Sequence, residues 1–362
     1  MADGYPVRLS NKPEDREAMP KVLSQDVATA AGVSKTTVSN YFNNPEKLTP
    51  GARERIRAAI ETLGYVRNHA ARQLRAGKSD VIAYVMFELG NTYFSDVANA
   101  IEKRAAEAGL FVVLGNNGGD RKRENAYLEL FEAQGVRGII VAPVGPVDAY
   151  LEAIRKRGTP AVITGREAAS DDQPSISVEN TRGGYLAAQH LIEQGKTRLA
   201  FIGGPLDIRQ INDRLLGASQ AVQEHGNVSL EIISVEERTI DRGRLVAKHL
   251  LGLQPDRRPD GIFAANDMLG VGIVDGVLEN PDIRVPEDIA IIGFDDLDIA
   301  SSGAVPLSSV RTSHEDYGRI AVELLLAELG EIPPLPTKHV VLQPEIVRRS
   351  STIGTTTSPR EL

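Results

Sequence analysis

The chain of 362 residues has no cysteine, no tryptophan and no long apolar run. Without cysteine it cannot form a disulfide, an iron–sulfur cluster, a thiol nucleophile or a cysteine zinc site, which is compatible with a reducing compartment. No apolar run approaches the ~18 residues of a membrane span. Residues 1–20 are polar and mixed in charge, unlike a secretory signal. We therefore expect a cytoplasmic protein that does not contact a membrane.

Common catalytic and cofactor-binding patterns are also missing. No Gly-x-Gly-x-x-Gly follows a strand pattern, and no Gly-x-Ser-x-Gly occurs. The six histidines are scattered, without the close pair of a zinc site. Gly195-Lys196-Thr197 resembles part of a phosphate-binding loop, but His190 stands where that loop needs its first glycine. Asp295 and Asp296 are adjacent at a strand end, where side chains usually point apart. We expect no enzyme, no cofactor and no bound metal.

The charges that are present are unevenly distributed. The formal net charge is −8, yet residues 19–79 hold ten Lys or Arg and only four Asp or Glu. The acidic excess therefore lies in the rest of the chain. A basic end on an acidic body indicates an anionic partner, such as nucleic acid, for that end alone. Chance unevenness is the alternative.

Residues 22–64 show a helical pattern with short loops. Ser24, Ser34 and Thr49 are candidate N-caps, and Gly32 provides a turn between the first two helices. The expected helices, caps included, run over about 24–31, 34–42 and 49–63. Two short helices joined by a tight turn are typical of a helix-turn-helix, although an ordinary helical hairpin has the same spacing. In a helix-turn-helix, the start of the second helix reaches base edges and phosphates.

From residue 81 onward, strand-like apolar runs alternate with helical patterns, which predicts parallel sheets flanked by helices. Nine such runs exceed one open sheet of usual size, so we expect two doubly wound subdomains with a ligand cleft at the strand carboxyl ends. The expected organisation is a flexible leader (1–19), a headpiece (20–64), a linker that could be helical (65–79), a two-subdomain body (80–349) and a Ser/Thr-rich disordered tail (350–362).

Several short motifs together resemble the LacI/GalR family of bacterial transcription regulators. In the headpiece and linker they are Asp26-Val27-Ala28, Ala31-Gly32-Val33-Ser34, Thr37-Val38-Ser39, Asn43, Leu63-Gly64-Tyr65, Asn68, Ala71-Arg72 and Leu74. In the body they are Ile176-Ser177-Val178-Glu179-Asn180, Gly183-Gly184, His190-Leu191-Ile192, Ile202-Gly203-Gly204-Pro205, Asn266-Asp267 and Ile292-Gly293-Phe294-Asp295-Asp296. The resemblance covers roughly 21–349. It implies an all-α headpiece, an effector domain of the periplasmic-binding-protein type, and a homodimeric, ligand-responsive repressor of a near-palindromic operator.

The resemblance also implies a set of DNA-contacting residues. The base-reading positions are Lys35, Thr36 and Asn40; many relatives carry Arg or His at the last, and a short amide there can pair with adenine instead of guanine. Leu74 stands at the position of the family's minor-groove wedge, in a hinge helix that orders on DNA. The complete expected set is Ser24, Ser34, Lys35, Thr36, Thr37, Ser39, Asn40, Asn43, Tyr65, Asn68, Ala71, Arg72, Leu74 and Arg75.

The effector-binding residues that the resemblance implies are Asn91, Tyr93, Phe94, Arg166, Arg214, Arg238, Asn266 and Asp295. Arg and Asp together can hold the vicinal hydroxyls of a sugar. If the three arginines all face the cleft, a sugar phosphate is favoured; a structural ion pair is the alternative for Arg166 or Asp295. A sugar-binding transport protein and a sugar-metabolising enzyme with a helical appendage are the rival functions. The segment after Arg349 lacks an apolar heptad, so no zipper-mediated tetramer is expected.

Overall fold

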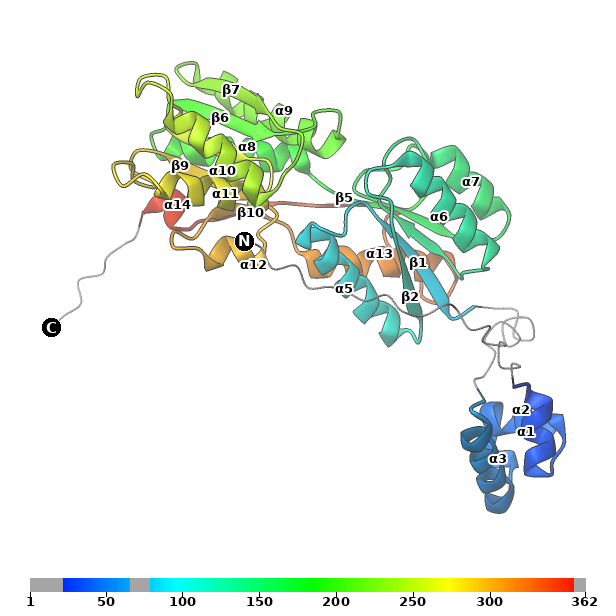
Figure 1. The fold of residues 1–362 in the computed structure, drawn as a ribbon. Coiled ribbons are helices and arrows are strands. Elements are labelled where there is room, and N and C mark those ends of the chain that lie inside the picture. The colour runs from blue at the N-terminus through cyan, green and yellow to red at the C-terminus, as the bar shows by residue number, and fades with distance from the viewer. Residues whose placement is uncertain (1–21, 66–78, 355–362) are drawn as a thin grey trace, which may run out of the picture. The chain divides into compact units, whose positions relative to one another are not determined.

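The computed structural model describes residues 22–65 and 79–354 and divides into two compact units, Met1–Lys78 and Ser79–Leu362 (Figure 1). The division lies within one residue of the boundary expected from the sequence. Across the two described ranges, no helix combines the length and the apolarity needed to cross a membrane. No group of three or more His, Asp or Glu side chains in those ranges could hold a metal ion.

The described part of the first unit is a small helical bundle. It consists of α1 (Ser24–Ala31), α2 (Lys35–Asn43), the 3-10 helix η1 (Pro45–Lys47) and α3 (Pro50–Leu63). One apolar stripe from each α-helix enters a common core of Val27, Ala28, Ala31, Val38, Ile56 and Ala59. Because α1 and α2 are joined by a short turn and sealed by this core, the unit is a helix-turn-helix, as predicted.

Local hydrogen bonds fix where these helices begin. Ser34 Oγ accepts a hydrogen bond from the backbone N of Thr37 (3.1 Å), and Thr49 Oγ1 caps α3 in the same way. Ser24, by contrast, is not the N-cap of α1. That position belongs to Leu23, whose backbone N donates to Asp26 Oδ2 at 2.7 Å. The carboxylate of Asp26, three residues after Leu23, thus satisfies a backbone donor at the helix start, and the Ser24 hydroxyl does not cap the helix.

The second unit contains two six-stranded sheets, with strand orders β11-β5-β4-β3-β1-β2 and β12-β10-β9-β8-β6-β7. Each is parallel apart from the antiparallel pairing of β12 with β10. The expected fold of two doubly wound parallel-sheet subdomains is therefore confirmed, with three short strands, β10, β11 and β12, that the sequence pattern did not reveal.

The first sheet is covered by helices on both faces (Figure 1). Alternate residues of β1 point to opposite faces: Ile82 and Tyr84 pack with α5 and α13, whereas Ala83 and Val85 pack with α6 and α7. Its strands are β1 (Val81–Met86), β2 (Phe111–Asn116), β3 (Ile139–Val141), β4 (Ala161–Thr164), β5 (Ser175–Val178) and β11 (His339–Leu342). Its helices are α5 (Thr92–Glu107), α6 (Arg121–Ala133), α7 (Asp148–Lys156) and α13 (His314–Glu328).

The second sheet repeats this plan. Ala200 and Ile202 of β6 face α10 and α11, and Leu199 and Phe201 face α8 and α9. Its strands are β6 (Arg198–Gly203), β7 (Ser229–Ser234), β8 (Gly261–Ala264), β9 (Ala290–Phe294), β10 (Ser308–Arg311) and β12 (Glu345–Val347). Its helices are α8 (Asn180–Glu193), α9 (Arg209–His225), α10 (Ile240–Leu251), α11 (Asp267–Leu278), α12 (Asp298–Ser302) and α14 (Ser350–Ile353). The chain crosses between the sheets after β5, β10 and β11.

The prediction that disorder begins at residue 350 is wrong, because residues 350–353 form the short helix α14. Ser351 and Thr352 are buried, and their hydroxyls are used. Ser351 Oγ donates to the carbonyl of Ile291, and Thr352 Oγ1 lies 2.7 Å from His190 Nε2. Satisfied hydroxyls can be buried at little cost, so a Ser/Thr-rich composition does not by itself indicate disorder.

Candidate nucleic-acid interface and ligand-binding cluster

The start of α2 presents a polar surface. Lys35 and Thr36 are exposed, and no described residue forms a side-chain hydrogen bond or ion pair with them. Val38 anchors the opposite face of the helix in the core. The Ser34 cap fixes the helix start, whose free N–H groups favour an anion such as a phosphate. The surface therefore combines side chains free to read base edges with a helix terminus suited to phosphate.

Other expected contact residues of the headpiece help to position this helix. The Asn43 amide donates to Ser39 Oγ at 3.3 Å, which joins two residues one turn apart. Tyr65 packs on the core, its ring 6.3 Å from that of Phe42. Ser24 and Asn40 are half-buried. The structure thus places the expected headpiece residues on one small bundle, as supports of α2 or on its surface.

Most of the net positive charge of residues 19–79 lies outside residues 22–65. Residues 22–65 hold five Lys or Arg and four Asp or Glu, so their net charge is only +1. Arg55 is used internally, donating from Nε to the carbonyl of Ala31 at the end of α1, and Arg57 pairs with Glu54. Five expected contact residues lie outside the described residues: Asn68, Ala71, Arg72, Leu74 and Arg75.

A second group of polar residues lies at the carboxyl ends of strands from both sheets, where doubly wound folds bind ligands. We call it the inter-sheet cluster, and it consists of Glu88, Tyr93, Arg214, Arg238, Asn266 and Asp295. Arg238 and Glu88 form an ion pair between the two subdomains, with 3.9 Å between Nη2 and Oε2. Side chains of both subdomains therefore meet in this cluster.

Arg214 is the best-anchored member of the inter-sheet cluster. Its guanidinium donates to Asn180 Oδ1 at 2.9 Å, to the carbonyl of Ala265, and to Asp295 Oδ1 at 3.4 Å. It also lies 3.5 Å above the centre of the Phe294 ring. These contacts hold a rigid fork of donors in one orientation, which suits recognition of paired oxygens.

Close helix packing sets the position of Arg214. Gly184 of α8 lies against the backbone of Arg214, so that a Cβ on Gly184 would come within 1.9 Å of the carbonyl oxygen of Arg214. Gly217 of α9 lies equally close to Thr181 O. Gly184 and Gly217 thus let α8 and α9 pack backbone to backbone, and this packing fixes the guanidinium above its partners.

Asp295 is held in an unusual backbone conformation. Its φ is 104° and that of Asp296 is 55°, both in the region that non-glycine residues avoid. Asp295 N donates to the carbonyl of Val310 at 2.8 Å, and Asp296 N donates to Ser309 Oγ. The two carboxylates take separate partners, since Asp296 pairs with Arg349 at 2.7 Å. The two carboxylates therefore do not form a catalytic acid pair. This agrees with the expectation that adjacent side chains at a strand end point apart.

Burial affects the protonation of this part of the cluster. Desolvation raises the pKa of Asp295, and the neighbouring charges of Arg214, His314 and Arg238 oppose that rise. Burial also raises the pKa of the Tyr93 phenol well above its ordinary value. The phenol therefore stays protonated as a hydrogen-bond donor, beside a carboxylate that can accept. Donors and acceptors of this kind match the hydroxyl groups of a sugar.

Asn266 connects two strand ends. Its Oδ1 accepts from the backbone N of Leu269 and caps α11, and its Nδ2 donates to the carbonyl of Arg238 at 3.4 Å. Arg238 in turn donates to the carbonyl of Gly204. The loop that follows β7 is therefore tied to the ends of β6 and β8, which positions the Arg238 side chain toward Glu88.

The remaining expected effector residues have structural partners. Arg166 forms an ion pair with Asp148, with 2.5 Å between Nη2 and Oδ2, and Nη1 donates to the other oxygen. Asn91 caps α5 by accepting from the backbone N of Tyr93. Phe94 stacks on Phe87 with 5.9 Å between ring centres. The alternative of a structural ion pair therefore describes Arg166 better than an unpaired cation does.

Sequence reasoning missed His314 at the start of α13. Its ring stands edge-on to Tyr93 at 4.9 Å, and Nδ1 lies 3.5 Å from Asp96 Oδ2. Its Nε2 is buried and has no hydrogen-bond partner among the described residues. A single histidine at the start of a helix carries no periodic or motif signal, so only the fold reveals it.

Lys196 confirms that residues 195–197 are not a phosphate-binding loop. Its Nζ donates to the carbonyls of Pro286 and Glu287 at 2.7 and 2.8 Å. The following Thr197 N donates to Asp260 Oδ1 at 3.0 Å. These groups join neighbouring loops, and a carboxylate already occupies the position that a phosphate would need.

Comparisons with known proteins agree with this architecture. Residues 25–68 match the description "Bacterial regulatory proteins, lacI family", and residues 188–352 match "Periplasmic binding protein-like domain". The ribose operon repressor of Escherichia coli (strain K12) is 30% identical over 331 residues, which cover 90% of this chain and 98% of that repressor.

Two solved structures extend over 91% of this chain and 99% of their own. The lac repressor dimer bound to operator and the anti-inducer ONPF is 26% identical with a TM-score of 0.75. The complex of the transcriptional regulator CelR with cellobiose is 28% identical with a TM-score of 0.65. The similarity thus includes both the helical unit and the two sheets.

Proposed function

The chain belongs to the LacI family of bacterial regulatory proteins and is a DNA-binding transcriptional regulator rather than an enzyme, and from this premise we propose how its two sites work together. A homodimer in the cytoplasm represses transcription by placing α2 of each headpiece in the major groove of a near-palindromic operator. A small sugar bound at the inter-sheet cluster sets the affinity for that operator. The relatives named above, a ribose operon repressor and a cellobiose complex, support a sugar ligand.

The anchored Arg214–Asp295 pair is the observation that carries the choice of ligand. Every arginine expected at the site has a carboxylate partner: Asp295 for Arg214, Glu88 for Arg238, and Asp148 for Arg166. The pairs are together neutral, so the excess positive charge that a sugar phosphate would need is missing. Oriented guanidinium donors beside carboxylate acceptors suit neutral vicinal hydroxyls instead.

Ligand and operator are coupled through the relative orientation of the two sheets. Residues of the inter-sheet cluster come from both subdomains, so a sugar bound there favours one orientation over others. That orientation sets the spacing of the two linkers of the dimer, which carry the headpieces. A coupling of ~1–3 kcal/mol would change operator affinity ~5–150-fold.

Selection of random duplex DNA on the full-length protein tests the proposal. At about 0.15 M salt, where phosphate binding without sequence preference is weak, we expect a palindrome to be enriched. Pools of neutral sugars should change the enrichment, and pools of sugar phosphates should not. If no sequence is enriched while a sugar still binds, the sugar-binding transport protein becomes the better description.

A matched pair of variants tests the role of α2. Thr36→Ala removes an exposed hydroxyl at the start of α2, and we expect altered base preference and weaker operator binding, by about 1 kcal/mol or more. Thr29→Ala is the control. It removes an exposed hydroxyl from α1, where Thr29 Oγ1 donates to the carbonyl of Gln25. Equal effects of the two changes on operator binding would contradict the assignment of α2.

A further inference from the structure

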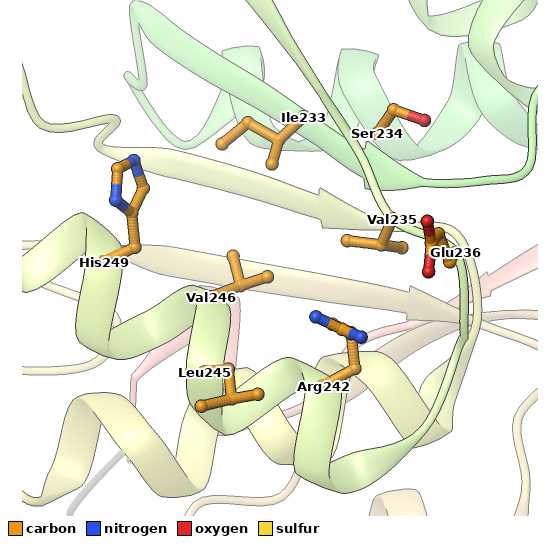
Figure 2. Close-up of a pocket in the computed structure, with 8 residues that line it drawn as sticks. All are labelled: Ile233, Ser234, Val235, Glu236, Arg242, Leu245, Val246 and His249. Atoms are coloured by element: carbon orange, nitrogen blue, oxygen red, sulfur yellow. The ribbon is translucent and has the colours of Figure 1, made fainter.

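A hollow outside the inter-sheet cluster lies between β7 and α10, on the edge of the second sheet (Figure 2). Its volume is about 440 Å³, within the ~300–1,000 Å³ typical of small-ligand pockets. Its lining residues are Ile233, Ser234, Val235, Glu236, Arg242, Leu245, Val246 and His249. It forms because β7 is an edge strand, so that no further strand fills the space beside α10.

The lining has one cationic group and an apolar wall. Arg242 points from the first turn of α10 into the hollow, and Val246 and His249 follow along the same helix (Figure 2). Val235 and Val246 belong to the hydrophobic core, and Ile233 packs against it. Leu245 is 59% exposed, although it is a large apolar side chain. An apolar surface therefore extends from Arg242 toward His249.

Arg242 has no partner within the described part of the chain. Its Nε is buried without a hydrogen bond, and no described carboxylate lies within 4 Å of its guanidinium. Glu236 lines the same hollow but is exposed and forms no ion pair with it. Arg244 of the same helix contrasts with it, because Asp241 and Asp275 both pair with Arg244. A guanidinium that lines a hollow without a carboxylate partner is available to pair with the anionic group of a ligand.

We propose that this hollow is a second ligand site, which takes a small organic anion with an apolar body. The carboxylate or phosphate group of the ligand pairs with Arg242, and its body lies against Val246 and Leu245 in the direction of His249. Charge-assisted bonds to a guanidinium supply the orientation. Burial of apolar surface supplies the remaining affinity.

The position of the hollow also couples it to the inter-sheet cluster. Val235 and Glu236 line the hollow, and Arg238 of the inter-sheet cluster lies only two residues further along the same loop. The carbonyl of Arg238 is held by Asn266 Nδ2 at 3.4 Å. An anion bound to Arg242 therefore acts on the loop that positions Arg238, and it changes the sugar affinity. This coupling rests on the proposed sugar site, whereas the anion site itself does not.

Isothermal titration of the full-length protein tests the site with two probes, phenyl phosphate and hexanoate. Benzyl alcohol is the neutral control, and inorganic phosphate is the control without an apolar body. We expect both probes to bind more tightly than either control. The probe that binds with the higher affinity identifies whether the site prefers a phosphate or a carboxylate.

Variants locate the binding. Arg242→Gln should weaken binding of the probes about tenfold or more, whereas Lys248→Gln removes an exposed cation of the same helix and should have no effect. Leu245→Glu places a negative charge on the exposed wall without disturbing the core, and it should weaken binding as well. Equal binding by the wild type and by folded Arg242→Gln and Leu245→Glu proteins would overturn the proposal, as would failure of both probes to bind.

The coupling has its own readout. With phenyl phosphate saturating, the sugar affinity of the wild type should change severalfold, and that of Arg242→Gln should not. An unchanged sugar affinity in the wild type would overturn the coupling. If no sugar binds at all, the proposed function fails, while the titration with phenyl phosphate alone still decides the anion site.

Discussion

Arg214 illustrates how one side chain depends on several elements. Its guanidinium contacts Asn180 of α8, the carbonyl that follows β8, and Asp295 after β9. The aromatic face of Phe294 lies beneath it. A lysine at this position would present a single compact charge and could not reach these three acceptors in the same geometry.

Arg214→Lys should therefore weaken sugar binding about tenfold or more while leaving operator binding without sugar intact. Arg209→Lys is the matched control, because Arg209 lies on the same helix, is exposed, and pairs only loosely with Asp213 (3.7 Å). Calorimetric titration measures the affinity of both variants for the sugar that changes the DNA selection. Similar sugar affinities for the two variants would contradict the role of Arg214.

His190 gives the stability of the second unit a defined pH dependence. It is buried, its Nε2 lies 2.7 Å from Thr352 Oγ1, and burial lowers its pKa below the ordinary value. The unfolded chain therefore binds a proton at higher pH than the folded chain does. The stability from neutral His190 is complete above the unfolded pKa of about 6.5 and is lost as pH falls through the folded pKa.

We expect the free energy of unfolding to fall by up to about 1 kcal/mol between pH 6.5 and 5.5 from this residue alone. His190→Gln retains a hydrogen-bonding group but cannot titrate, so the variant should show a smaller decrease over the same range. Urea unfolding at the two pH values measures the difference. An identical pH dependence for wild type and variant would show that His190 does not contribute.

Among single residues, those within a motif could be placed near one another from the sequence. Arg214 and Asp295 were predicted and do meet. The partner of Arg166 was not predictable, because Asp148 precedes it by 18 residues and follows a different strand. Only the parallel order of β3 and β4 brings the two charges together. Ion pairs formed across a sheet have no local signature in a sequence.

At the scale of elements, the contact between α8 and α9 is the tightest helix packing around the site. A Cβ at Gly184 would overlap the backbone carbonyl of Arg214. Backbone cannot move aside as a flexible side chain can, so the helices would have to separate. Their separation would also displace the guanidinium from Asp295.

Gly184→Ala should lower the free energy of unfolding by about 1–3 kcal/mol and weaken sugar binding. Gly51→Ala is the control, since Gly51 is helical and exposed in α3, where the nearest atom, 3.9 Å from a new Cβ, belongs to the side chain of Arg55. That change should stabilise slightly, because alanine favours helix. Thermal unfolding with separate probes for each unit distinguishes the two outcomes.

Helix α14 closes the second subdomain through buried hydroxyls. Thr352 Oγ1 lies 2.6 Å from Ser308 Oγ as well as close to His190. Thr352→Val keeps the shape of the side chain but leaves the buried His190 Nε2 without its partner, whereas Ser308 Oγ keeps its bonds to the backbone of Arg349. We expect a loss of about 1–3 kcal/mol in the free energy of unfolding, measured in urea. No measurable loss would mean that the Thr352 hydroxyl does not stabilise the unit.

Elements with long apolar runs were predictable, and short strands that are polar or have distant partners were not. The strands β1, β6 and β9 are continuous apolar runs, as expected of strands buried on both faces. In contrast, β10 begins Ser308-Ser309, and β11 pairs with β5, more than 160 residues earlier in the chain. Strand pairing over such a distance depends on the whole topology. A strand with a polar start, such as β10, and a short strand with a distant partner, such as β11, are therefore recognised only in the structure.

At the scale of the whole molecule, two sites with different chemistry occur in one chain. The headpiece offers exposed side chains on α2, and the inter-sheet cluster offers neutral, oriented pairs of donors and acceptors. The two subdomains are linked by three chain crossings, after β5, β10 and β11. Such connections allow a change of orientation without unfolding. In the proposed mechanism, the sugar and the operator both shift the same equilibrium between orientations of the subdomains.

The most direct test is therefore to measure the sugar affinity of the dimer with and without saturating operator, and the operator affinity with and without saturating sugar. Linkage requires the two ratios to be equal, and we expect each to lie in the range of ~5–150-fold. Sugar and operator affinities that are independent of each other would contradict the account, even if each ligand bound tightly.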